Sequence, residues 1–504
     1  MEKKKKLDIS TIVFSALFTI LICAAVFLFP QQSTRAANAV FSFVMNKFCS
    51  IILWFGLAIL IFMIWLGFSK YKNIPLGEEK PEFSRFQIFV MIFCAAFGAS
   101  AMYWCMVEAL MYYQYSFYGA APLSAMAAEW ALSYNFMHWG PTTWAMYPMC
   151  AIPVIYSYYV KKNPQLKLSS ICDTLYEGKM PAVFGKVADV IYIFSCFGAC
   201  AISLGISVPM ISRCLAAVIG INASFKMNVG IILVISAVFT LSSYVGLAKG
   251  MAKLSSMNAW FFIIFLIFVL LITGPFKVLD MVTNSLGLLF NNYIRVSLWT
   301  DPIQGGGFPQ GWTAFYWTYV LTFAPGMGIF IARIMKGYKL KDVVWISLIF
   351  GSLGCFTMHG IMESYALNVE LSGLLPVAEM VNSGQDYEAI VMMIQAMPFG
   401  KLALIAFSIV AVLFMATTVD SNSFTLSTMV SYQLDSQGNP SPILRLMWCV
   451  ILAAFPLTLI AINAPLNTLK TIALVVAIPL AILFIIMNIR TVKCMARDTP
   501  KKAG

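Results

Sequence analysis

The sequence predicts an all-α, polytopic membrane protein with about twelve transmembrane helices. The first observation is composition: of 504 residues, 61% are hydrophobic and only 11% are charged, whereas a soluble domain carries about 25% charged residues. The second is that apolar runs long enough to cross a bilayer, about 20 residues each, recur along the whole chain. The third is that basic residues gather in every second loop between these runs. Such a chain cannot cover a globule with polar surface, so soluble classes of protein are excluded.

Each apolar run predicts one transmembrane helix. The runs are residues 10–30, 50–69, 87–113, 138–160, 187–219, 228–248, 256–275, 311–335, 342–367, 400–431, 444–463 and 467–490. The fifth and tenth exceed the length of a simple span, which indicates tilted helices or extra turns. Between the seventh and eighth, the segment DMVTNSLGLLFNNYIRVSLWTDP is too polar to span and predicts an amphipathic helix at the outer interface.

Basic residues alternate between the two sides of the predicted bundle. They gather in the N-terminal tail, in the second, fourth, sixth and eighth loops, and in the C-terminal tail. The intervening loops contain few, and the one from Glu363 to Glu388 is acidic. The positive-inside rule then predicts a multi-pass protein of the cell inner (cytoplasmic) membrane with both termini in the cytoplasm. The net charge of +12 is explained by this orientation, so we expect no nucleic-acid partner.

Residue types that build metal and catalytic centres are scarce. The twelve cysteines form no CxxC pair, and many lie inside apolar runs, where a cysteine acts as a small buried hydrophobe. Two histidines are too few for a typical histidine-based metal site. Because we find no convergent nucleophile and base and no phosphate-binding glycine loop, the sequence predicts neither an enzyme nor an ATP-driven pump. We expect no cofactor, with sodium as the one candidate ion.

Two runs contain small residues that would interrupt a helix near mid-membrane. The third carries CAAFGASAMYW, with Gly98 near its middle, and the eighth carries FAPGMG, from Phe323 to Gly328. Interruptions at matching positions in two halves point to the central site of a transporter, although small-residue packing between helices gives a similar pattern. The predicted organisation is a tail with two extra helices (1–86), two five-helix units (87–275 and 311–492), a connector between them (276–310) and a short cytoplasmic tail (493–504).

Aromatic residues cluster in the fourth and eighth runs. The fourth begins HWGPTTWAMYP and the eighth contains GWTAFYWTYVLTFAPGMG. Tyr319 and Phe323 are one helical turn apart, so we expect their rings to face the same way. An aromatic cage attracts a cation by roughly 0.5–2 kcal/mol per ring, and it suits a quaternary ammonium group, which cannot donate hydrogen bonds. The candidate cage residues are Trp139, Trp144, Tyr147, Trp312, Trp317, Tyr319 and Phe323; an interfacial aromatic belt is the alternative, above all for Trp312.

The motifs at these positions resemble the betaine/choline/carnitine transporter family over nearly the whole chain. HWGPTTWAMY in the fourth run, PEFS before the third and VGLAKG before the seventh fit the family. TDPIQGGGFPQGWTAFYW running into IFIARI is similar to the carnitine/γ-butyrobetaine exchangers in particular. The resemblance implies a LeuT-like inverted repeat of five plus five helices, preceded by two extra helices. It also implies a homotrimer and alternating access.

The resemblance assigns substrate-binding roles position by position. In the fourth run, Trp139, Trp144 and Tyr147 match the family's aromatic box. In the eighth, the usual FYWAWW reads FYWTYV, so that Tyr319 and Val320 stand where tryptophans are usual. Phe323 keeps an aromatic ring one turn later. Met327 matches a methionine that lines the substrate path in the exchangers. Met111 likewise stands where the exchangers have a tyrosine. Loss of the tryptophan at Val320 indicates a roomier pocket or one shaped for a different substrate.

The resemblance gives conflicting indications about the driving ion. Sodium-coupled members carry GxGxG in the third run, where this chain reads AFGAS around Phe97 and keeps only Gly98. The exchangers replace sodium by an arginine in the seventh run, and here that position is Asn258. In the tenth run, Thr417 and Thr418 match the hydroxyl pair that binds sodium in coupled members, and such oxygen ligands suit a hard cation. Sodium, a proton or no ion at all therefore stay open, as do helix-packing roles for the two hydroxyls.

Two acidic residues are predicted inside the membrane. A charge at mid-bilayer costs about 2.5–3.5 kcal/mol on insertion scales, so each is a candidate functional residue. Glu108 matches a family acid and is a candidate to attract a cationic substrate or to titrate. Asp420 lies three residues after Thr417 and is either an ion-coupling residue or a buried polar strut.

These features predict a secondary active transporter of a quaternary ammonium compound of the carnitine, γ-butyrobetaine or betaine type. Substrate exchange is favoured, partly because the short tail argues against an osmosensor. A sodium-coupled betaine or choline symporter is the alternative, and a channel for methylated amines is a third reading, which would not need matched helix interruptions. The expected partners are the small-molecule substrate, the lipid bilayer and two further copies of the chain.

Overall fold

The computed structural model describes residues 7–97, 100–245, 250, 252–435, 439–462 and 466–498. In this part of the chain the secondary structure is almost entirely helical, and only three isolated β-bridges occur. Ten of the described helices are long and apolar enough to cross a membrane, and there are eleven spans if one bent helix pair is counted as a broken span. The prediction of an all-α polytopic membrane protein is therefore confirmed.

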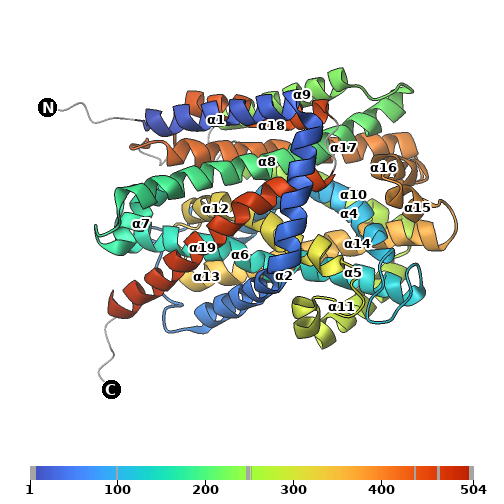
Figure 1. Ribbon diagram of the computed structural model, residues 1–504, viewed down its shortest axis with the longest axis horizontal. Coiled ribbons are helices and arrows are strands. Elements are labelled where there is room, and N and C mark those ends of the chain that lie inside the picture. Colours follow the sequence, from blue (N-terminus) through green and yellow to red (C-terminus); the bar gives the residue numbers. More distant parts are fainter. Residues whose placement is uncertain are drawn as a thin grey trace.

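The helices follow one another through short connections (Figure 1). They are α1 (Ile9–Leu28), α2 (Pro30–Phe68), α3 (Arg85–Phe97), α4 (Ser100–Tyr113), α5 (Ala125–Trp139), α6 (Pro141–Ile155), α7 (Leu168–Tyr176), α8 (Ala182–Ile219), α9 (Phe225–Val245), α10 (Ala252–Thr273), α11 (Pro275–Leu298), α12 (Ala314–Ile334), α13 (Leu340–Trp345), α14 (Ser352–Leu371), α15 (Val377–Asn382), α16 (Asp386–Gln395), α17 (Gly400–Met429), α18 (Pro442–Ala461) and α19 (Leu466–Asp498). Short π-helical turns adjoin them within the described residues: η1 (Tyr156–Val160), η3 (Pro309–Thr313) and η4 (Ile346–Gly351).

Helix α12 is the central element of the bundle. It is buried along the whole of its apolar length, whereas α1 is largely exposed at the edge. It packs against α6, α8, α17 and α19, while α2 and α19 cross the front of the molecule (Figure 1). A helix that is surrounded on every side is the natural place for a site away from lipid.

Two predicted boundaries need correction. The second helix starts at Pro30 rather than near residue 50, because a proline at the first helical position is compatible with helix and the sequence beyond it contains no strong helix breaker. The fourth run, predicted to begin at residue 138, is entered by a separate helix, α5, which ends at Gly140 before α6. Helix α5 was not predicted as part of an apolar run because it contains several polar residues. The predicted amphipathic segment does form a helix, α11.

The predicted interruption in the third run is confirmed, and the one in the eighth is wrong. Helices α3 and α4 are inclined by 71°, and Gly98 between them lies outside the described residues. In contrast, α12 runs unbroken through Pro325. Proline removes only one backbone hydrogen bond, and Gly328 serves close packing: a Cβ there would lie 2.7 Å from the carbonyl carbon of Cys150 on α6. The alternative of small-residue packing therefore holds for this run, and the division into two five-helix units stays a prediction.

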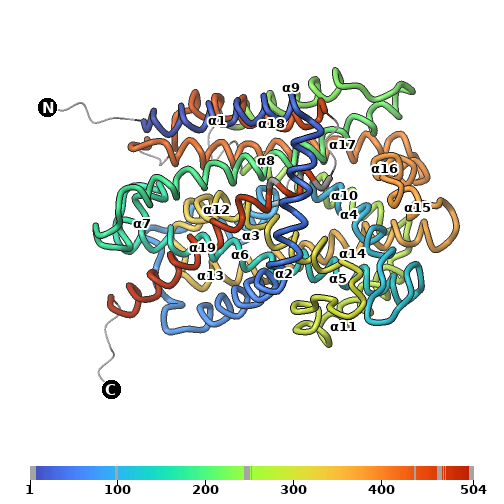
Figure 2. Tube along the Cα trace, viewed as in Figure 1, coloured from blue at the N-terminus to red at the C-terminus, as the bar shows by residue number. Residues whose placement is uncertain are grey.

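Segments that the charge pattern placed on one side are joined to one another. Helix α1 begins and α19 ends at the same end of the bundle, on the left (Figure 2). Lys167, before α7, forms ion pairs with Asp8 at the start of α1 and with Asp189 on α8. Lys161 pairs with Asp498 at the end of α19, at 2.5 Å. The first, fourth and last basic segments thus share one face.

We expect Lys167→Met to lower the free energy of unfolding by about 3–5 kcal/mol, because it leaves the buried carboxylates of Asp8 and Asp189 without their cation. Lys161→Met is the matched control, since its pair with Asp498 is partly exposed and should cost about 1 kcal/mol or less. Unfolding of the purified variants in detergent measures both. Equal effects would contradict the structural role given to Lys167.

The pH dependence of this contribution follows from Asp8. Burial raises the pKa of Asp8. Hydrogen bonds from Lys167, Ser10 and the Thr11 amide lower it by a larger amount, so the net pKa lies well below the usual range. A carboxyl group with a lowered pKa stabilises the fold above its unfolded pKa, about 3.9. The contribution is therefore complete at neutral pH and lost only as the pH falls below about 4.

Candidate functional site

Glu108 is fully buried on α4 and accepts hydrogen bonds on both carboxylate oxygens. The hydroxyl of Tyr112, one turn later on α4, donates to Oε1. The indole N–H of Trp139, the last residue of α5, donates to Oε2 at 2.7 Å. Donors that point at a carboxylate favour its charged form. Glu108 thus places a hydrogen-bonded carboxyl group in the middle of the bundle.

Aromatic rings from three helices gather at this carboxylate. The ring of Tyr316 on α12 lies edge-on to Trp139, with centroids 5.4 Å apart, and to Trp104 of α4, at 6.1 Å. Tyr319 lies 6.0 Å from Tyr316. We call Trp104, Glu108, Trp139, Tyr316 and Tyr319 the aromatic–carboxylate cluster; all five are buried. Rings beside a carboxylate form a site for an organic cation.

Two members of this cluster were missed by the sequence analysis. Trp104 lies one helical turn before Glu108, and Tyr316 lies three residues before Tyr319. Residues three or four apart share a helix face, so this spacing could have found both. Trp139, Tyr319 and Glu108 were predicted, and the structure brings these three together.

Tyr319 and Phe323 face the same way on α12, as expected from their spacing, and with Met327 they form a stripe along that helix. The rings of Tyr319 and Phe323 are in edge contact at 5.2 Å, and Met327 follows one turn later on the same face. The hydroxyl of Tyr319 lies 3.0 Å from that of Ser100, at the start of α4. Val320 is buried beside this stripe. The stripe therefore continues the cluster along α12 from the point where α4 begins.

Trp144 and Tyr147 form a second aromatic group on α6, with their rings 5.3 Å apart. Trp144 also stacks on Phe93 of α3, at 6.2 Å and an interplanar angle of 8°. Gly351 lies against the Trp144 ring so closely that a Cβ there would be 2.1 Å from it. The indole N–H of Trp144 points at the sulfur of Cys355, which lies 3.4 Å from the indole nitrogen. Trp144 therefore packs between α3 and the start of α14.

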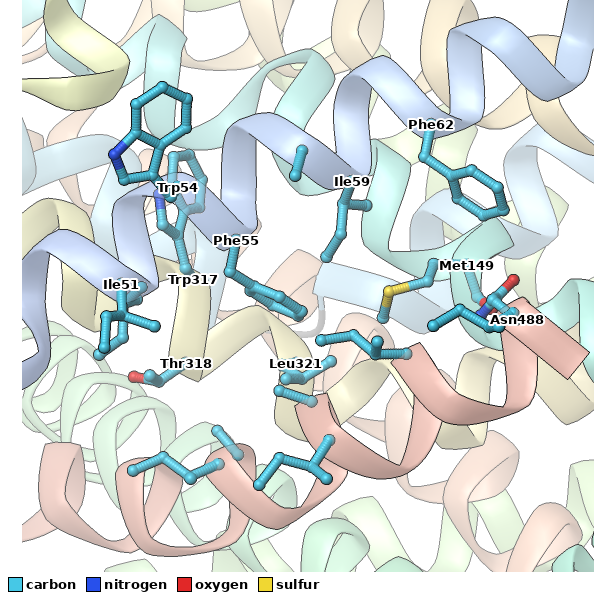
Figure 3. Close-up of a pocket in the computed structure, with 18 of the residues that line it drawn as sticks. Ile51, Trp54, Phe55, Ile59, Phe62, Met149, Trp317, Thr318, Leu321 and Asn488 are labelled. Atoms are coloured by element: carbon cyan, nitrogen blue, oxygen red, sulfur yellow. The ribbon is translucent and has the colours of Figure 1, made fainter.

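The structure places Trp317 outside the aromatic–carboxylate cluster. Trp317 lines an apolar groove between α2 and α19, together with Thr318 and Leu321 (Figure 3). Its indole lies against Gly56 of α2, where a Cβ would be 2.7 Å from the indole nitrogen. Successive helical residues are about 100° apart, so a residue two positions before Tyr319 lies on the opposite side of α12.

Trp312 and Met111 line a cavity of about 1210 Å³ at the N-terminal end of α12, which we call the outer cavity. Three acidic residues from the predicted acidic loop also line it: Glu370, Glu379 and Asp386. Lys470 of α19 reaches into it, with Nζ 3.6 Å from the centroid of the Trp312 ring and 3.1 Å from the Gly311 carbonyl oxygen. One face of Trp312 is thus covered by the protein's own ammonium group, which sequence spacing could not reveal.

Several candidate ion residues meet near the end of α3. The hydroxyl of Thr417 donates to the carbonyl of Cys94, at 3.2 Å. Asn258 of α10 directs its amide nitrogen to the Cys94 sulfur, at 3.9 Å, and its Oδ1 is buried without a hydrogen-bond partner. Thr418 bonds within its own helix, to the Phe414 carbonyl. The side chain of Phe97 lies outside the described residues. A hydroxyl, a carbonyl and an amide oxygen suit a hard cation.

Asp420 has the contacts of a polar strut. It forms a buried ion pair with Arg445 of α18 and accepts a hydrogen bond of 2.8 Å from Ser242 of α9. Its charge is matched and it ties three helices together. The structural alternative is therefore supported over an ion-coupling role.

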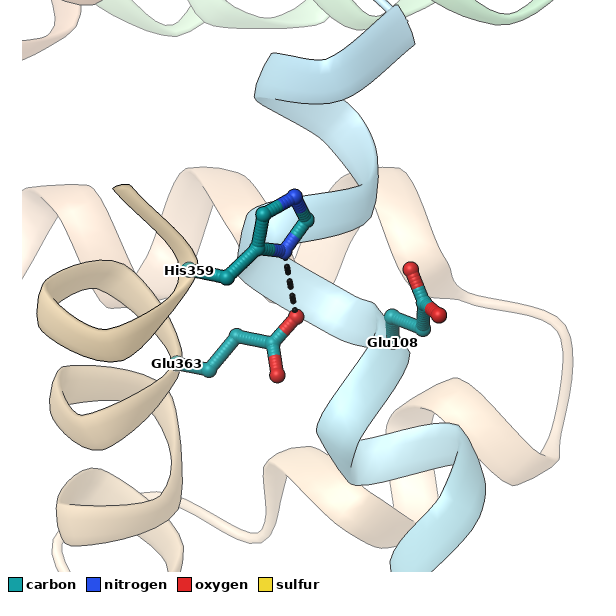
Figure 4. A group of neighbouring side chains, drawn as sticks. All are labelled: Glu108, His359 and Glu363. Atoms are coloured by element: carbon teal, nitrogen blue, oxygen red, sulfur yellow. Dashed lines mark hydrogen bonds and ion pairs between the residues drawn. The ribbon is translucent and has the colours of Figure 1, made fainter. Parts of the chain in front are cut away.

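A second buried carboxylate lies near Glu108. Glu363 was assigned to a loop by the sequence analysis, but it belongs to α14, one turn after His359 (Figure 4). Ligand atoms of Glu108, His359 and Glu363 lie within 4.8 Å of one another. A histidine and a glutamate at positions i and i+4 share a helix face, which is the signal that could have found the pair.

A bundle of this many long apolar helices is typical of a multi-pass membrane protein. The sequence model of the betaine/carnitine/choline family transporters matches residues 10–500, and the chain belongs to this family. It is 33% identical over 489 residues to a carnitine transporter of Acinetobacter baumannii, covering 97% of this chain and 89% of that protein. It is 32% identical over 424 residues to the uncharacterized transporter YeaV of Escherichia coli, covering 84% and 88%.

Among solved structures, a substrate-bound, outward-open sodium-coupled sialic acid symporter is similar with a TM-score of 0.45 and 14% identity, covering 89% of this chain and 86% of that one. We draw nothing from so distant a likeness. The family match confirms the resemblance found in the motifs and the prediction of a transporter rather than an enzyme.

Proposed function

We propose that this protein is a secondary active transporter that exchanges quaternary ammonium compounds of the carnitine, γ-butyrobetaine or betaine type by alternating access. The aromatic–carboxylate cluster carries this proposal. A quaternary ammonium group offers no hydrogen-bond donor, so ring faces and a nearby negative charge are the means of binding it. Glu108 supplies the charge, and Trp104, Trp139, Tyr316 and Tyr319 supply the rings.

The relatives and the substituted positions support the substrate class. The Acinetobacter baumannii relative bears the name of a carnitine transporter. Tyr319 and Val320 replace larger rings on α12, and Met111 lines the outer cavity where the exchangers have a tyrosine. The substrate is accordingly a methylated amine held by fewer α12 tryptophans than is usual in the family.

Sodium-coupled symport is the second candidate, and one observation favours it. Thr417, the Cys94 carbonyl and the unpartnered Oδ1 of Asn258 place three oxygen atoms near the end of α3. Asn258 also lacks the positive charge that an arginine would supply there. Exchange remains our proposal because the AFGAS stretch keeps only one of the glycines typical of coupled members.

Uptake into liposomes tests the proposal. Purified protein is reconstituted, and labelled carnitine, γ-butyrobetaine, glycine betaine and choline are offered to empty and to substrate-loaded vesicles, with and without a sodium gradient. We expect uptake that needs internal substrate and ignores sodium. Uptake into empty vesicles driven by sodium would establish symport instead, and transport of none of the four would overturn the substrate class.

Thr417→Val separates the two coupling modes. We expect a loss of exchange rate of about fivefold at most, because one hydrogen bond of about 1 kcal/mol is lost, and the same loss with and without sodium. Thr428→Val is the matched control, since its hydroxyl bonds only within α17, to Phe424. A defect of Thr417→Val that appears only when sodium is present would support a bound sodium ion.

We also propose that the chain forms a homotrimer in the cytoplasmic membrane, with both termini in the cytoplasm. The joined basic segments at one end of the bundle support this orientation. Chemical cross-linking of the purified protein measures the oligomeric state.

A further inference from the structure

A histidine–carboxylate pair lies beside the aromatic–carboxylate cluster and has no part in the exchange described so far. Nδ1 of His359 is 3.0 Å from Oε1 of Glu363 (Figure 4). Asn135 of α5 donates to the same oxygen, at 2.5 Å. Oε2 of Glu363 and Nε2 of His359 have no hydrogen-bond partner, and both side chains are fully buried. Unpartnered buried polar atoms of this kind call for a ligand.

The charges of the pair and of Glu108 are coupled. Atoms of the three groups lie within 4.8 Å of one another. Two carboxylates at this separation in a buried site do not both ionise unless a cation or proton joins them. Glu108 already accepts hydrogen bonds from Tyr112 and Trp139. The place for an added positive charge is therefore the His359–Glu363 pair.

A proton fits this place better than a metal ion. The separation of 3.0 Å between Nδ1 and Oε1 is that of a hydrogen bond, so a proton already lies between these two atoms. A metal ion would have to displace it and also compete with Tyr112 and Trp139 for Glu108. Hard cations moreover prefer about six oxygen ligands, whereas this group offers two carboxylates and an imidazole.

We propose that the His359–Glu363 pair is a proton-binding site, and that its protonation competes with binding of the cationic head group of the substrate. The link is Trp139: the His359 ring stacks on it, with centroids 4.8 Å apart and an interplanar angle of 26°, and Trp139 donates to Glu108. An imidazolium there is a cation on a ring face and beside a carboxylate, which is what the substrate needs. Substrate binding therefore releases a proton from the pair to water.

The other titratable groups around the pair are already engaged. His138 of α5 is bonded at both ring nitrogens, to Tyr112 and to Thr313, at 2.8 and 3.0 Å. Lys470 of α19 is bonded to the Gly311 carbonyl. Lys277 of α11 binds Asn368, further along α14. The remaining titratable side chains around the cluster are buried: Cys105 and Tyr112 on α4 and Tyr316 on α12.

Equilibrium binding of labelled γ-butyrobetaine to the purified protein tests this inference, which rests on the proposed function. Measured between about pH 5 and 8, the apparent Kd of the wild type should rise by up to about tenfold per pH unit below the titration midpoint. A pH indicator in weak buffer should report about one proton released per substrate bound below that midpoint, and none well above it.

Two variants of the pair and one matched control complete the test. His359→Gln and Glu363→Gln should each abolish the slope and the proton release, while His138→Gln, at the other buried histidine, should retain both. A wild-type Kd that is constant with pH would overturn the inference whatever the variants do, and so would a slope that survives in either pair variant. Binding of none of the four quaternary ammonium compounds at any pH would instead overturn the proposed function, and the inference with it.

Discussion

Glu108→Gln is expected to weaken binding of a quaternary ammonium substrate by about 30- to 100-fold, since removing one partner of a buried charge interaction typically costs about 2–3 kcal/mol. Glutamine has nearly the same shape, and its amide oxygen can still accept from Tyr112 or Trp139. The substitution thus removes the charge while keeping most of the packing. Equilibrium binding to the purified variant measures the effect.

Glu379→Gln is the matched control for this prediction. Glu379 lines the outer cavity and is exposed, and exposed charges contribute about 1 kcal/mol or less. We expect its affinity to stay within about fivefold of the wild type. If Glu108→Gln bound the substrate as tightly as Glu379→Gln, the buried carboxylate would not recognise the cation.

Trp139→Leu is expected to weaken binding by at least about tenfold. A desolvated cation–π contact contributes about 2 kcal/mol, and the variant also removes the 2.7 Å hydrogen bond that orients Glu108. The ring contacts with Tyr316 and His359 are lost as well. Binding and exchange rate in liposomes measure the effect.

Trp317→Leu provides the comparison, because it removes a ring of equal size from the other side of α12. Trp317 is as buried as Trp139 but faces Gly56 and the apolar groove. Its substitution should lower stability without a comparable loss of affinity. An equal loss of affinity in both variants would mean that general disruption of the packing around α12, rather than cation binding, explains the effect of Trp139→Leu.

The helical bundle could be predicted from the sequence because its determinants are local. Apolar runs and basic loops are read along the chain, and the bend between α3 and α4 follows a stretch of small residues. The unbroken course of α12 could not be predicted in this way. Pro325 and Gly328 give the same pattern in an interrupted helix and in one packed closely on α6, and only the position of Cys150 distinguishes the two.

The candidate site was partly predictable for the same reason. Glu108, Trp139 and Tyr319 were found from residue type and resemblance, and the structure places them together. Trp317 was misplaced because membership of an aromatic run does not say which helix face a ring occupies.

The residues missed by the sequence analysis depend on long-range contacts. Lys470 meets Trp312 from a distant helix. Glu363 lies within the predicted run 342–367 but was counted with the acidic loop that follows it, and the structure places it on α14. His359 gains significance from its contacts with Glu363 and Trp139. Local sequence patterns do not predict such contacts between helices that are distant in the sequence.

The central claim is that the aromatic–carboxylate cluster recognises the positive charge of its substrate. The most direct measurement compares the affinity of the purified protein for γ-butyrobetaine with that for its uncharged isostere, in which a carbon atom replaces the quaternary nitrogen. The two molecules have nearly the same shape and differ in charge. We predict that the charged compound binds at least about 30-fold more tightly, which corresponds to about 2 kcal/mol. Equal affinities would show that the site selects only shape, and would contradict the account.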